Sequence, residues 1–364
     1  MKKILTVVGT RPNFIKVTRF KKAAREQGNV DLRIVHTGQH YDDRMSRIFF
    51  QQFGLEPDHA LGVKRGSSNA QMAGTMLGLE RLMLEEFHPD LVLVVGDVNA
   101  TLAAALTSER MGIPIGHVES GLRSFDRSMP EEVNRVLTDE LAREFFITEQ
   151  SGWDHLCEEG RATEHLHFVG NTMIDTLLAY EGEIDKSKVL EELGLREKAF
   201  ALMTIHRPST VDHEEGLLKL LELIRFIAEG QKLLFPLHPR TKKNLEEFGL
   251  YARFQRIPGL ILTEPMDYFG FQKLIKASAF VLTDSGGIQE ETTFRRVPCL
   301  TLRPNTERPS TVRLGTNTLL PFETDQLKEY IEAIGNGTYK KGEVPPYWDG
   351  KASERIFKVL AESE

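Results

Sequence analysis

A Ser-Gly-Gly turn in the second half of the chain has the residue types of an anion-binding site. The segment LTDSGGIQEETTF (282–294) is predicted to form the end of a buried strand, a tight turn and the start of a helix. Ser285, Gly286 and Gly287 would then present backbone N–H groups at the positive end of that helix. Six helical residues rise about 9 Å, so Glu291 lies about a sugar's length from the turn. A carboxylate there can accept hydrogen bonds from two ribose hydroxyls. The turn and this carboxylate together predict a nucleoside diphosphate ligand.

Three carboxylates in the first half of the chain could move protons. Asp97 and Glu119 each follow an apolar run, in VVGDVNAT and GHVESGLRS, and Glu131 opens a helix in MPEEVNR. Each alone is equally well explained as a helix cap or as a favourable acid of a first helical turn. Because all three should converge on one edge of one sheet, we expect them to raise one another's pKa and to supply acid and base together.

Basic residues at other strand ends could complement these acids. Arg11 and Lys16 lie at the strand-to-helix turn of VVGTRPNFIK, where a solvated loop with a capping threonine is the alternative. His206 ends the strand ALMTIH, and a structural histidine is the commoner role at such a position. Arg308 in NTERP is a candidate for bidentate binding of phosphate, with a surface ion pair as the alternative.

The elements that must position these residues alternate along the chain. Helical periodicity is clear at 68–87, 100–112 and 214–230. Short apolar runs of strand type lie between the helical segments, which indicates βαβ units with parallel sheets covered on both faces. They occupy residues 3–9, 32–38, 90–97, 113–119, 144–149, 166–171, 200–206, 232–239, 260–265, 279–287, 297–303 and 316–321.

The length of 364 residues is that of two domains. We therefore predict an α/β protein with two Rossmann-like domains, 1–175 with the carboxylates and 176–349 with the nucleotide, joined near 172–190. Ligands of such folds bind beyond the carboxyl ends of the strands, so the two sheets should face a central cleft. A last helix, 350–364, could pack back on the first domain.

Composition narrows the function classes. The net charge of −7, with acids and bases intermixed, disfavours nucleic acid as a partner. The first apolar run is short and β-branched, and no run reaches the length of a membrane span, so we expect a cytoplasmic protein. The cysteines Cys157 and Cys299 form no redox or metal motif. The chain has no G-x-G-x-x-G after its first strand, no P-loop and no metal-ligand spacing, so we expect neither cofactor nor metal.

Several longer motifs resemble the non-hydrolysing UDP-N-acetylglucosamine 2-epimerases, in order and from the first strand to the last helix. They are GTRPNFIK, HTGQHYDD, GDVNAT, HVESGLRSFDRSMPEEVNR, VGNTMID, TIHRPSTVD, HPRT, TDSGGIQEE and NTERP. The resemblance implies the two-domain GT-B fold, a homodimer and a role in cell-surface polysaccharide biosynthesis. It also implies interconversion of UDP-GlcNAc and UDP-ManNAc, by anti elimination of UDP to a 2-acetamidoglucal and re-addition.

The same resemblance assigns roles to individual residues. The acid/base carboxylates would be Asp97, Glu119 and Glu131, and His206 would stabilise the departing UDP. Glu291 would bind the ribose, and Phe271 would lie by the uracil. The residues implied to hold the diphosphate are Arg11, Lys16, Ser285, Gly286, Gly287 and Arg308.

The chain departs from the family pattern at several positions, and alternatives follow. Asn13 stands where many members have Glu, HRPST replaces HRREN, and Met266 replaces a Gln near the nucleotide. KRGSSNAQ replaces the segment through which bacterial members bind an activating second UDP-GlcNAc. The alternatives are a 2-epimerase of a UDP-2,3-diacetamido sugar, a GT-B glycosyltransferase that needs an acceptor, and a regulator that binds a UDP-sugar without catalysis.

Overall fold

The structure is a computed structural model that describes residues 1–38, 52–64, 66–322 and 324–362. Most of the motif HTGQHYDD, from residue 39 on, lies outside these ranges, as does residue 65 of KRGSSNAQ. The chain forms two compact units, Met1–Ala179 together with Pro346–Glu364, and Tyr180–Pro345.

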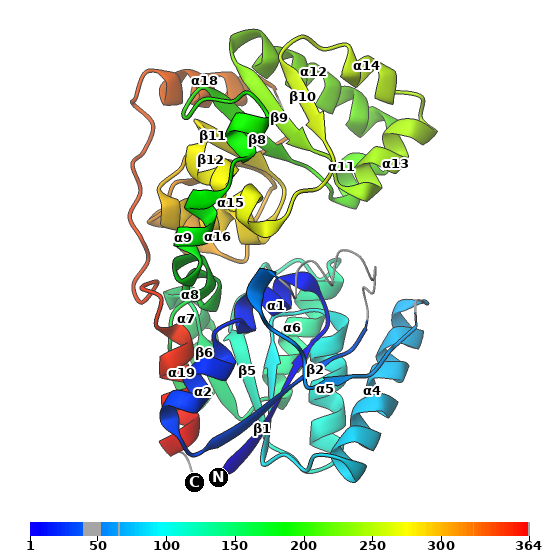
Figure 1. Cartoon of the computed structure of the whole chain (residues 1–364), viewed down its shortest axis with the longest axis vertical. Helices are drawn as coiled ribbons and strands as arrows, with labels where there is room; N and C mark the ends of the chain where they lie inside the picture. Colours follow the sequence, from blue (N-terminus) through cyan, green and yellow to red (C-terminus); the bar gives the residue numbers. More distant parts are fainter. Residues whose placement is uncertain (39–51, 65, 323, 363–364) are drawn as a thin grey trace. The chain divides into compact units, whose positions relative to one another are not determined.

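The first unit is built on a seven-stranded parallel sheet (Figure 1) with the order β3-β2-β1-β4-β5-β6-β7. Its strands are β1 (Lys2–Val8), β2 (Val30–His36), β3 (His59–Ala60), β4 (Leu91–Val95), β5 (Ile115–Ser120), β6 (Glu144–Ile147) and β7 (Leu166–Phe168). Every residue of β4 is buried, as expected for a parallel strand with helices on both faces.

Two groups of helices cover this sheet (Figure 1). One group comprises α1 (Arg11–Val17), α2 (Phe20–Gln27), α8 (Thr172–Ala179) and the C-terminal α19 (Ala352–Glu362). The other comprises α4 (Ser68–Glu85), α5 (Asn99–Arg110) and α6 (Pro130–Leu141). The remaining helices are α7 (Gln150–Glu158) and the 3₁₀ turn η1 (Thr163–His165).

The C-terminal helix belongs to the first unit. Asp175 of α8 accepts hydrogen bonds from the backbone N–H groups of Ala352 and Ser353, at 3.0 and 2.6 Å, and so satisfies the start of α19. The rings of Phe20 in α2 and Phe357 in α19 lie 5.3 Å apart and edge to face.

The second unit repeats the plan with six parallel strands in the order β10-β9-β8-β11-β12-β13. Its strands are β8 (Phe200–Thr204), β9 (Lys232–Pro236), β10 (Leu260–Thr263), β11 (Phe280–Thr283), β12 (Cys299–Leu302) and β13 (Asn317–Leu320). Its helices are α9 (Glu181–Lys186), α10 (Val189–Glu192), α11 (Pro208–Val211), α12 (Glu214–Gly230), α13 (Pro239–Glu247), α14 (Tyr251–Gln255), α15 (Tyr268–Ala277), α16 (Gly286–Arg295), α17 (Pro309–Arg313) and α18 (Thr324–Gly335).

The predicted α/β class with two parallel sheets is confirmed. Each of the predicted strands is present, and the helical segments at 68–87, 100–112 and 214–230 are α4, α5 and α12. Among the described strands, the sequence analysis did not predict β3, because its two residues are too few to form a recognisable pattern. Within the described ranges, no helix combines the length and the apolar character needed to cross a lipid bilayer.

Candidate active site

The turn after β1 is fastened to the end of β4. The N–H and hydroxyl groups of Thr10 donate to Asn13 Oδ1 at 3.2 and 2.8 Å, which forms a capping box at the start of α1. Asn13 Nδ2 also donates to the carbonyl of Val95, at 2.8 Å. Asn13, where this chain departs from the family pattern, therefore joins two strand ends. The side chain of Arg11 lies outside the described part of the structure, so its role stays a prediction.

Lys16 and Glu119 form a buried ion pair beside Gly96. The two side chains are 9% and 6% exposed, and Lys16 Nζ donates to Glu119 Oε2. Gly96 has a φ of 68°, and a Cβ at this position would lie 3.2 Å from Lys16 Nζ and 3.6 Å from Glu119 Oε2. Glycine allows both the left-handed backbone and this close approach. Lys16, which is predicted to bind the diphosphate, thus neutralises Glu119, which is predicted to act as an acid or base.

The backbone of Glu119 adopts an uncommon conformation. Its φ is 71°, and the pairing of β5 with β6 shifts register between Val118 and Ser120, which places Glu119 in a bulge. A non-glycine residue in the left-handed region costs about 1–3 kcal/mol and persists where its surroundings over-determine it. Bulges commonly re-aim a side chain next to an active site. The bulge is the strongest local sign that Glu119 is functional.

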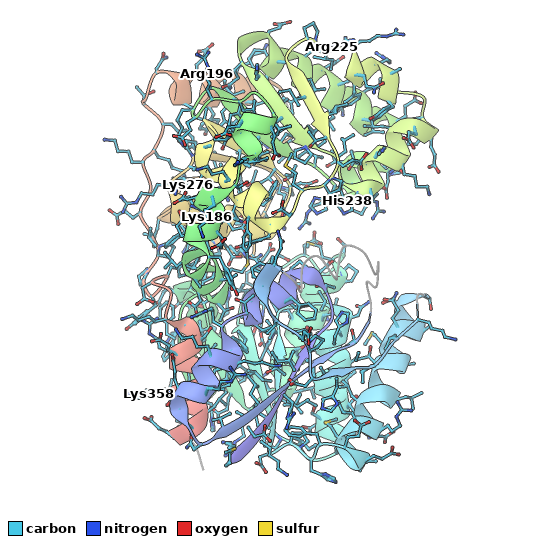
Figure 2. All side chains as sticks on the ribbon, viewed as in Figure 1. Lys186, Arg196, Arg225, His238, Lys276 and Lys358 are labelled. Atoms are coloured by element: carbon cyan, nitrogen blue, oxygen red, sulfur yellow. The ribbon has the colours of Figure 1, made fainter. Side chains whose placement is uncertain are left out.

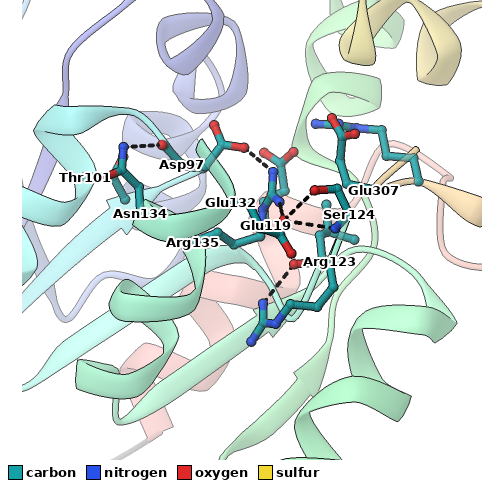
Figure 3. A network of polar contacts seen from close by, with 12 residues as sticks. Asp97, Thr101, Glu119, Arg123, Ser124, Glu132, Asn134, Arg135 and Glu307 are labelled. Atoms are coloured by element: carbon teal, nitrogen blue, oxygen red, sulfur yellow. Dashed lines mark hydrogen bonds and ion pairs between the residues drawn. The ribbon is translucent and has the colours of Figure 1, made fainter. Parts of the chain in front are cut away.

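Asp97 is held by two residues of α6 (Figure 3). Its carboxylate forms an ion pair with Arg135, and its carbonyl accepts a hydrogen bond from Asn134 Nδ2 at 3.0 Å. Arg135 Nη1 also donates to Glu132 Oε2, at 2.5 Å. The Asp97 side chain is 22% exposed, so the carboxylate stays accessible at the carboxyl end of β4.

The neighbouring glutamates Glu131 and Glu132 have different environments. Glu132 is buried and accepts hydrogen bonds from the N–H and hydroxyl of Ser124 (Figure 3) and from the N–H of Phe125, all at 2.9 Å. Glu131 is exposed and has no hydrogen-bond or ion-pair partner among the described residues. Glu132 therefore shapes the 124–125 turn, whereas Glu131 remains open to a ligand.

In the second unit, Asp284 orients His206 after β8. His206 Nδ1 lies 3.0 Å from Asp284 Oδ1, and Asp284 Oδ2 accepts from the N–H groups of His206 and Arg207 at 2.9 and 2.7 Å. Burial alone would raise the pKa of Asp284, but the interaction with His206 and the backbone donors outweigh burial and lower it. The His206 side chain is 37% exposed, and its ring centroid lies 5.2 Å from that of His238, which is labelled in Figure 2.

The Ser-Gly-Gly turn opens α16, as the sequence predicts. Ser285 precedes the helix, and Gly286 leaves room for the Arg308 side chain, because a Cβ there would lie 2.7 Å from Arg308 Nη1. Arg308 is buried, pairs with Glu307, and places its Nε 2.8 Å from Glu290 Oε2. The alternative role of Arg308, a surface ion pair, is therefore only half right. Arg308 does form ion pairs, but they are buried at the N-terminus of α16.

Glu291 lies in the next turn of α16. It is 5% exposed, and burial raises its pKa to about 7 against the opposing effects of Gln272 and Arg295. Phe271 of α15 is half-buried and packs against the core between α15 and β8. The second unit thus places the glycine turn and Glu291 on α16, with Arg308 beside the start of that helix.

The chain is similar to known proteins over nearly its whole length. The family model of UDP-N-acetylglucosamine 2-epimerase matches residues 22–361. The chain belongs to this family. It is 38% identical over 364 residues to UDP-N-acetylglucosamine 2-epimerase of Methanocaldococcus jannaschii, a match covering 98% of each chain. It is also 38% identical to UDP-2,3-diacetamido-2,3-dideoxy-D-glucuronate 2-epimerase of Pseudomonas aeruginosa, over 99% of each chain.

Solved structures of 2-epimerases share the fold along the whole chain. The M. jannaschii UDP-GlcNAc 2-epimerase in complex with UDP-GlcNAc and UDP superposes with a TM-score of 0.89 at 38% identity, over 99% of this chain and 100% of that one. The Neisseria meningitidis enzyme bound to UDP-GlcNAc also gives 0.89, at 30% identity and the same coverage. The predicted GT-B type of fold and the predicted family are therefore confirmed.

Several residues of this site were not predicted from the sequence. Arg135 and Asn134 follow Glu131 in the motif MPEEVNR, so their helical spacing was the available signal. Asp284 precedes Ser285 at the end of β11, the position that had identified Asp97 after β4. The same rule, a polar residue directly after a buried strand, would have found it.

Proposed function

We propose that the chain interconverts UDP-GlcNAc and UDP-ManNAc. One observation carries the proposal: Asp97 and Glu119 lie at the carboxyl ends of neighbouring strands, and they pair with different cations, Arg135 and Lys16. Gly96, which precedes Asp97, approaches Glu119 closely enough that a Cβ would lie 3.6 Å from its carboxylate. Two carboxylates at adjacent strand ends can serve as the base and, once protonated, the acid of a reversible proton transfer.

The proposed reaction is an elimination followed by an addition. A carboxylate removes the C2 proton of the sugar, the C–H electrons form the C1=C2 bond, and the C1–O bond breaks as UDP leaves with its electron pair. UDP oxygen then attacks C1 of the 2-acetamidoglucal while a protonated carboxyl delivers a proton to the other face of C2. The atoms balance, and only the configuration at C2 has changed.

The departure of UDP needs electrostatic help, because no carbonyl acidifies the C2 proton. In this proposal the N–H groups of the turn at Ser285–Gly287, together with Arg308 and His206, stabilise the charge that develops on the leaving diphosphate. Lys16 and Arg11 add cations from the first unit, Glu291 binds the ribose, and Phe271 lies by the uracil. Asp97, Glu119 and Glu131 are the proposed acid/base groups.

The first experiment is a proton NMR assay with UDP-GlcNAc as the only substrate. The proposal predicts that the anomeric signal of UDP-ManNAc appears without added metal, cofactor or acceptor, and that the two sugars reach equilibrium. A chain that leaves UDP-GlcNAc unchanged until an acceptor is added would be a glycosyltransferase. A chain that binds UDP and converts nothing would be a binding protein.

A second candidate is supported by the likeness to the P. aeruginosa enzyme, which is as high as that to the M. jannaschii enzyme. In that case the substrate is a UDP-2,3-diacetamido sugar with a C6 carboxylate. Its elimination chemistry at C1 and C2 is the same, so only the contacts to C3 and C6 differ. Comparing kcat/KM for the two UDP-sugars decides between them, and the better substrate should lead by at least about tenfold, or 1.4 kcal/mol.

We further propose that the enzyme works as a cytoplasmic homodimer that supplies sugars for cell-surface polysaccharides, as the family resemblance implies. Light scattering coupled to size exclusion tests the dimer. A mass near that of a single chain, 41.3 kDa, would contradict it.

A further inference from the structure

We propose that Asp139 is a positioning residue that holds the backbone on both sides of Glu119 and, through His117, the peptide that precedes Asp97. This inference rests on the proposed function, because that function gives Glu119 and Asp97 their acid/base roles.

The two carboxylate oxygens of Asp139 bind residues on either side of Glu119 in the chain. It lies on α6 and is completely buried. Its Oδ1 accepts from His117 Nδ1 at 2.6 Å, and its Oδ2 accepts from the N–H of Gly121 at 3.0 Å. His117 precedes Glu119 by two residues and Gly121 follows it by two. One carboxylate therefore fastens both ends of the bulge in which Glu119 adopts its left-handed conformation.

His117 extends this hold to the neighbouring strand. Its Nε2 lies 2.8 Å from the carbonyl oxygen of Gly96, the residue that directly precedes Asp97. A carbonyl oxygen only accepts hydrogen bonds, and so does an ionised carboxylate. His117 must therefore donate from both ring nitrogens, one to Gly96 and one to Asp139, which requires the imidazolium form. The ring is completely buried, so water cannot replace either bond.

The charges around this pair balance. Arg123 donates to Asp139 Oδ2 at 2.6 Å and, on its other side, to both carboxylate oxygens of Glu159 at 2.9 and 2.7 Å. Burial alone would raise the pKa of Asp139, but His117 and then Arg123 outweigh burial and lower it. Two cations and two carboxylates thus alternate from His117 to Glu159. The other charged groups beside the Gly96 peptide, Lys16 and Glu119, neutralise each other.

This arrangement suits a site that must hold a strained residue still. The left-handed backbone of Glu119 would relax if its flanks were released. A shift of about 1 Å in a reacting group can lower a rate by about 100-fold while the rest of the substrate still binds. Asp139 should therefore act on turnover and not on nucleotide affinity, since the proposed UDP ligands belong mainly to the second unit.

The test variant is Asp139→Asn, which keeps the shape and removes one acceptor. The amide NH₂ that faces His117 makes its Nδ1 an acceptor, so the ring becomes neutral and donates only to Gly96. The matched control is Glu159→Gln, which removes the outer carboxylate of the same cluster and leaves the bonds to His117 and Gly121 intact. Turnover of UDP-GlcNAc, calorimetric binding of UDP, and NMR of ¹⁵N-histidine-labelled protein at pH 7 are measured for each.

We expect the wild type and Glu159→Gln to show protons on both ring nitrogens of His117, assigned with His117→Gln. Asp139→Asn should show a neutral ring, kcat at least 30-fold lower, and a Kd for UDP within threefold of the wild type. A neutral His117 in the wild type overturns the proposal, and so does an Asp139→Asn variant with kcat within threefold of the wild type.

Two further outcomes remain decisive. If Asp139→Asn does not fold, the wild-type spectrum still tests the inference, because a neutral ring cannot donate both bonds. If the wild type folds and binds UDP but epimerises neither UDP-GlcNAc nor the diacetamido sugar, the proposed function fails. The positioning role in that reaction then falls with it, whatever the spectrum of His117 shows.

Discussion

The two units handle buried charge differently around their candidate ligands. In the first unit two carboxylates pair with different cations, Glu119 with Lys16 and Asp97 with Arg135, which also pairs with Glu132. In the second unit Arg308 lies between two carboxylates, Glu290 and Glu307, at the N-terminus of α16, and Glu307 also pairs with Arg303. Asp97 and Glu119 are therefore paired with different cations, whereas Glu290 and Glu307 have Arg308 in common.

This difference fits the division of labour that we propose. A proton-transfer carboxylate needs a fixed orientation and a stable charge, and a paired cation supplies both. A leaving diphosphate brings its own charges and needs donors that it can share with the protein, as Arg308 and the helix N-terminus offer. Two carboxylates differ from these pairs. Glu131 is exposed in the first unit, and Glu291 is buried in the second, where Gln272 and Arg295 oppose the rise in its pKa.

The largest expected effect comes from removing proton transfer in the first unit. Asp97→Asn keeps the shape and the Asn134 bond to the backbone, but it cannot take a proton, so kcat should fall by about 10²–10⁴-fold. The Kd for UDP should stay within a few-fold. Asp90→Asn is the matched control, because Asp90 precedes the other end of the same strand and is exposed. Equal losses in both variants would remove Asp97 from the chemistry.

Glu131→Gln tests whether exposure excludes a catalytic role. If Glu131 acts as an acid or base, its variant should also lose about 10²–10⁴-fold in kcat, with little change in melting temperature because no described residue depends on it. Glu132→Gln should instead lower stability, since Glu132 binds Arg135 and the 124–125 turn. Steady-state kinetics and thermal unfolding separate the two. Full turnover in Glu131→Gln would reduce the acid/base set to Asp97 and Glu119.

Arg308→Ala addresses the shared cation of the second unit. Removing it leaves Glu290 and Glu307 buried with less compensation, which should cost about 3–5 kcal/mol of unfolding free energy. UDP should raise the melting temperature of the wild type far more than uridine does, and the variant should lose most of that difference. Arg240→Ala is the control, because Arg240 pairs with Asp212 in an exposed position and should cost at most about 1 kcal/mol. Uridine and UDP stabilising the wild type equally would contradict the diphosphate assignment.

The smallest effect concerns Glu291 and pH. Its folded pKa of about 7 exceeds the ordinary value of 4.5, so the folded chain binds more protons than the unfolded chain between these values. The stability that the protonated form contributes is complete below pH 4.5 and is lost as pH rises through 7. Glu291→Gln should therefore match the wild type at pH 5 and exceed it at pH 8 by on the order of 2–3 kcal/mol. Denaturant unfolding at both pH values checks this, with the exposed Glu247→Gln as control. A pH-independent difference would mean that Glu291 is ionised throughout.

The sequence was sufficient for the strands and for the polar residues that follow them. Apolar runs mark parallel strands because both faces are buried, and Asp97, Glu119 and His206 are conspicuous where those runs end. The partners of these residues were not predictable in the same way. Lys16 and Glu119 are 103 residues apart and Asp97 and Arg135 are 38 apart, and a local pattern does not specify which residues of one sheet edge touch.

Local backbone conformation was the second feature that could not be predicted from the sequence. Nothing in GHVESGLRS indicates that Glu119, and not only the following glycine, has a positive φ, because glutamate carries no left-handed preference. The choice between Glu131 and Glu132 needed the rotation of α6 about its axis, which the packing of Asp139 and Thr138 against the sheet determines. The prediction that the three carboxylates raise one another's pKa considered only their like charges. It did not include the cations Arg135 and Lys16, because a local sequence pattern does not show which residues pair across the sheet.

The most direct test of the proposed chemistry is epimerisation in D₂O, followed by NMR and mass spectrometry of the product. Elimination and re-addition release the C2 hydrogen as a proton, so UDP-ManNAc formed from UDP-GlcNAc should carry deuterium at C2. Small amounts of UDP and of the 2-acetamidoglucal should also appear during turnover. Product that retains undiluted protium at C2 would indicate hydride transfer or transient oxidation, and it would contradict the acid/base roles of Asp97, Glu119 and Glu131.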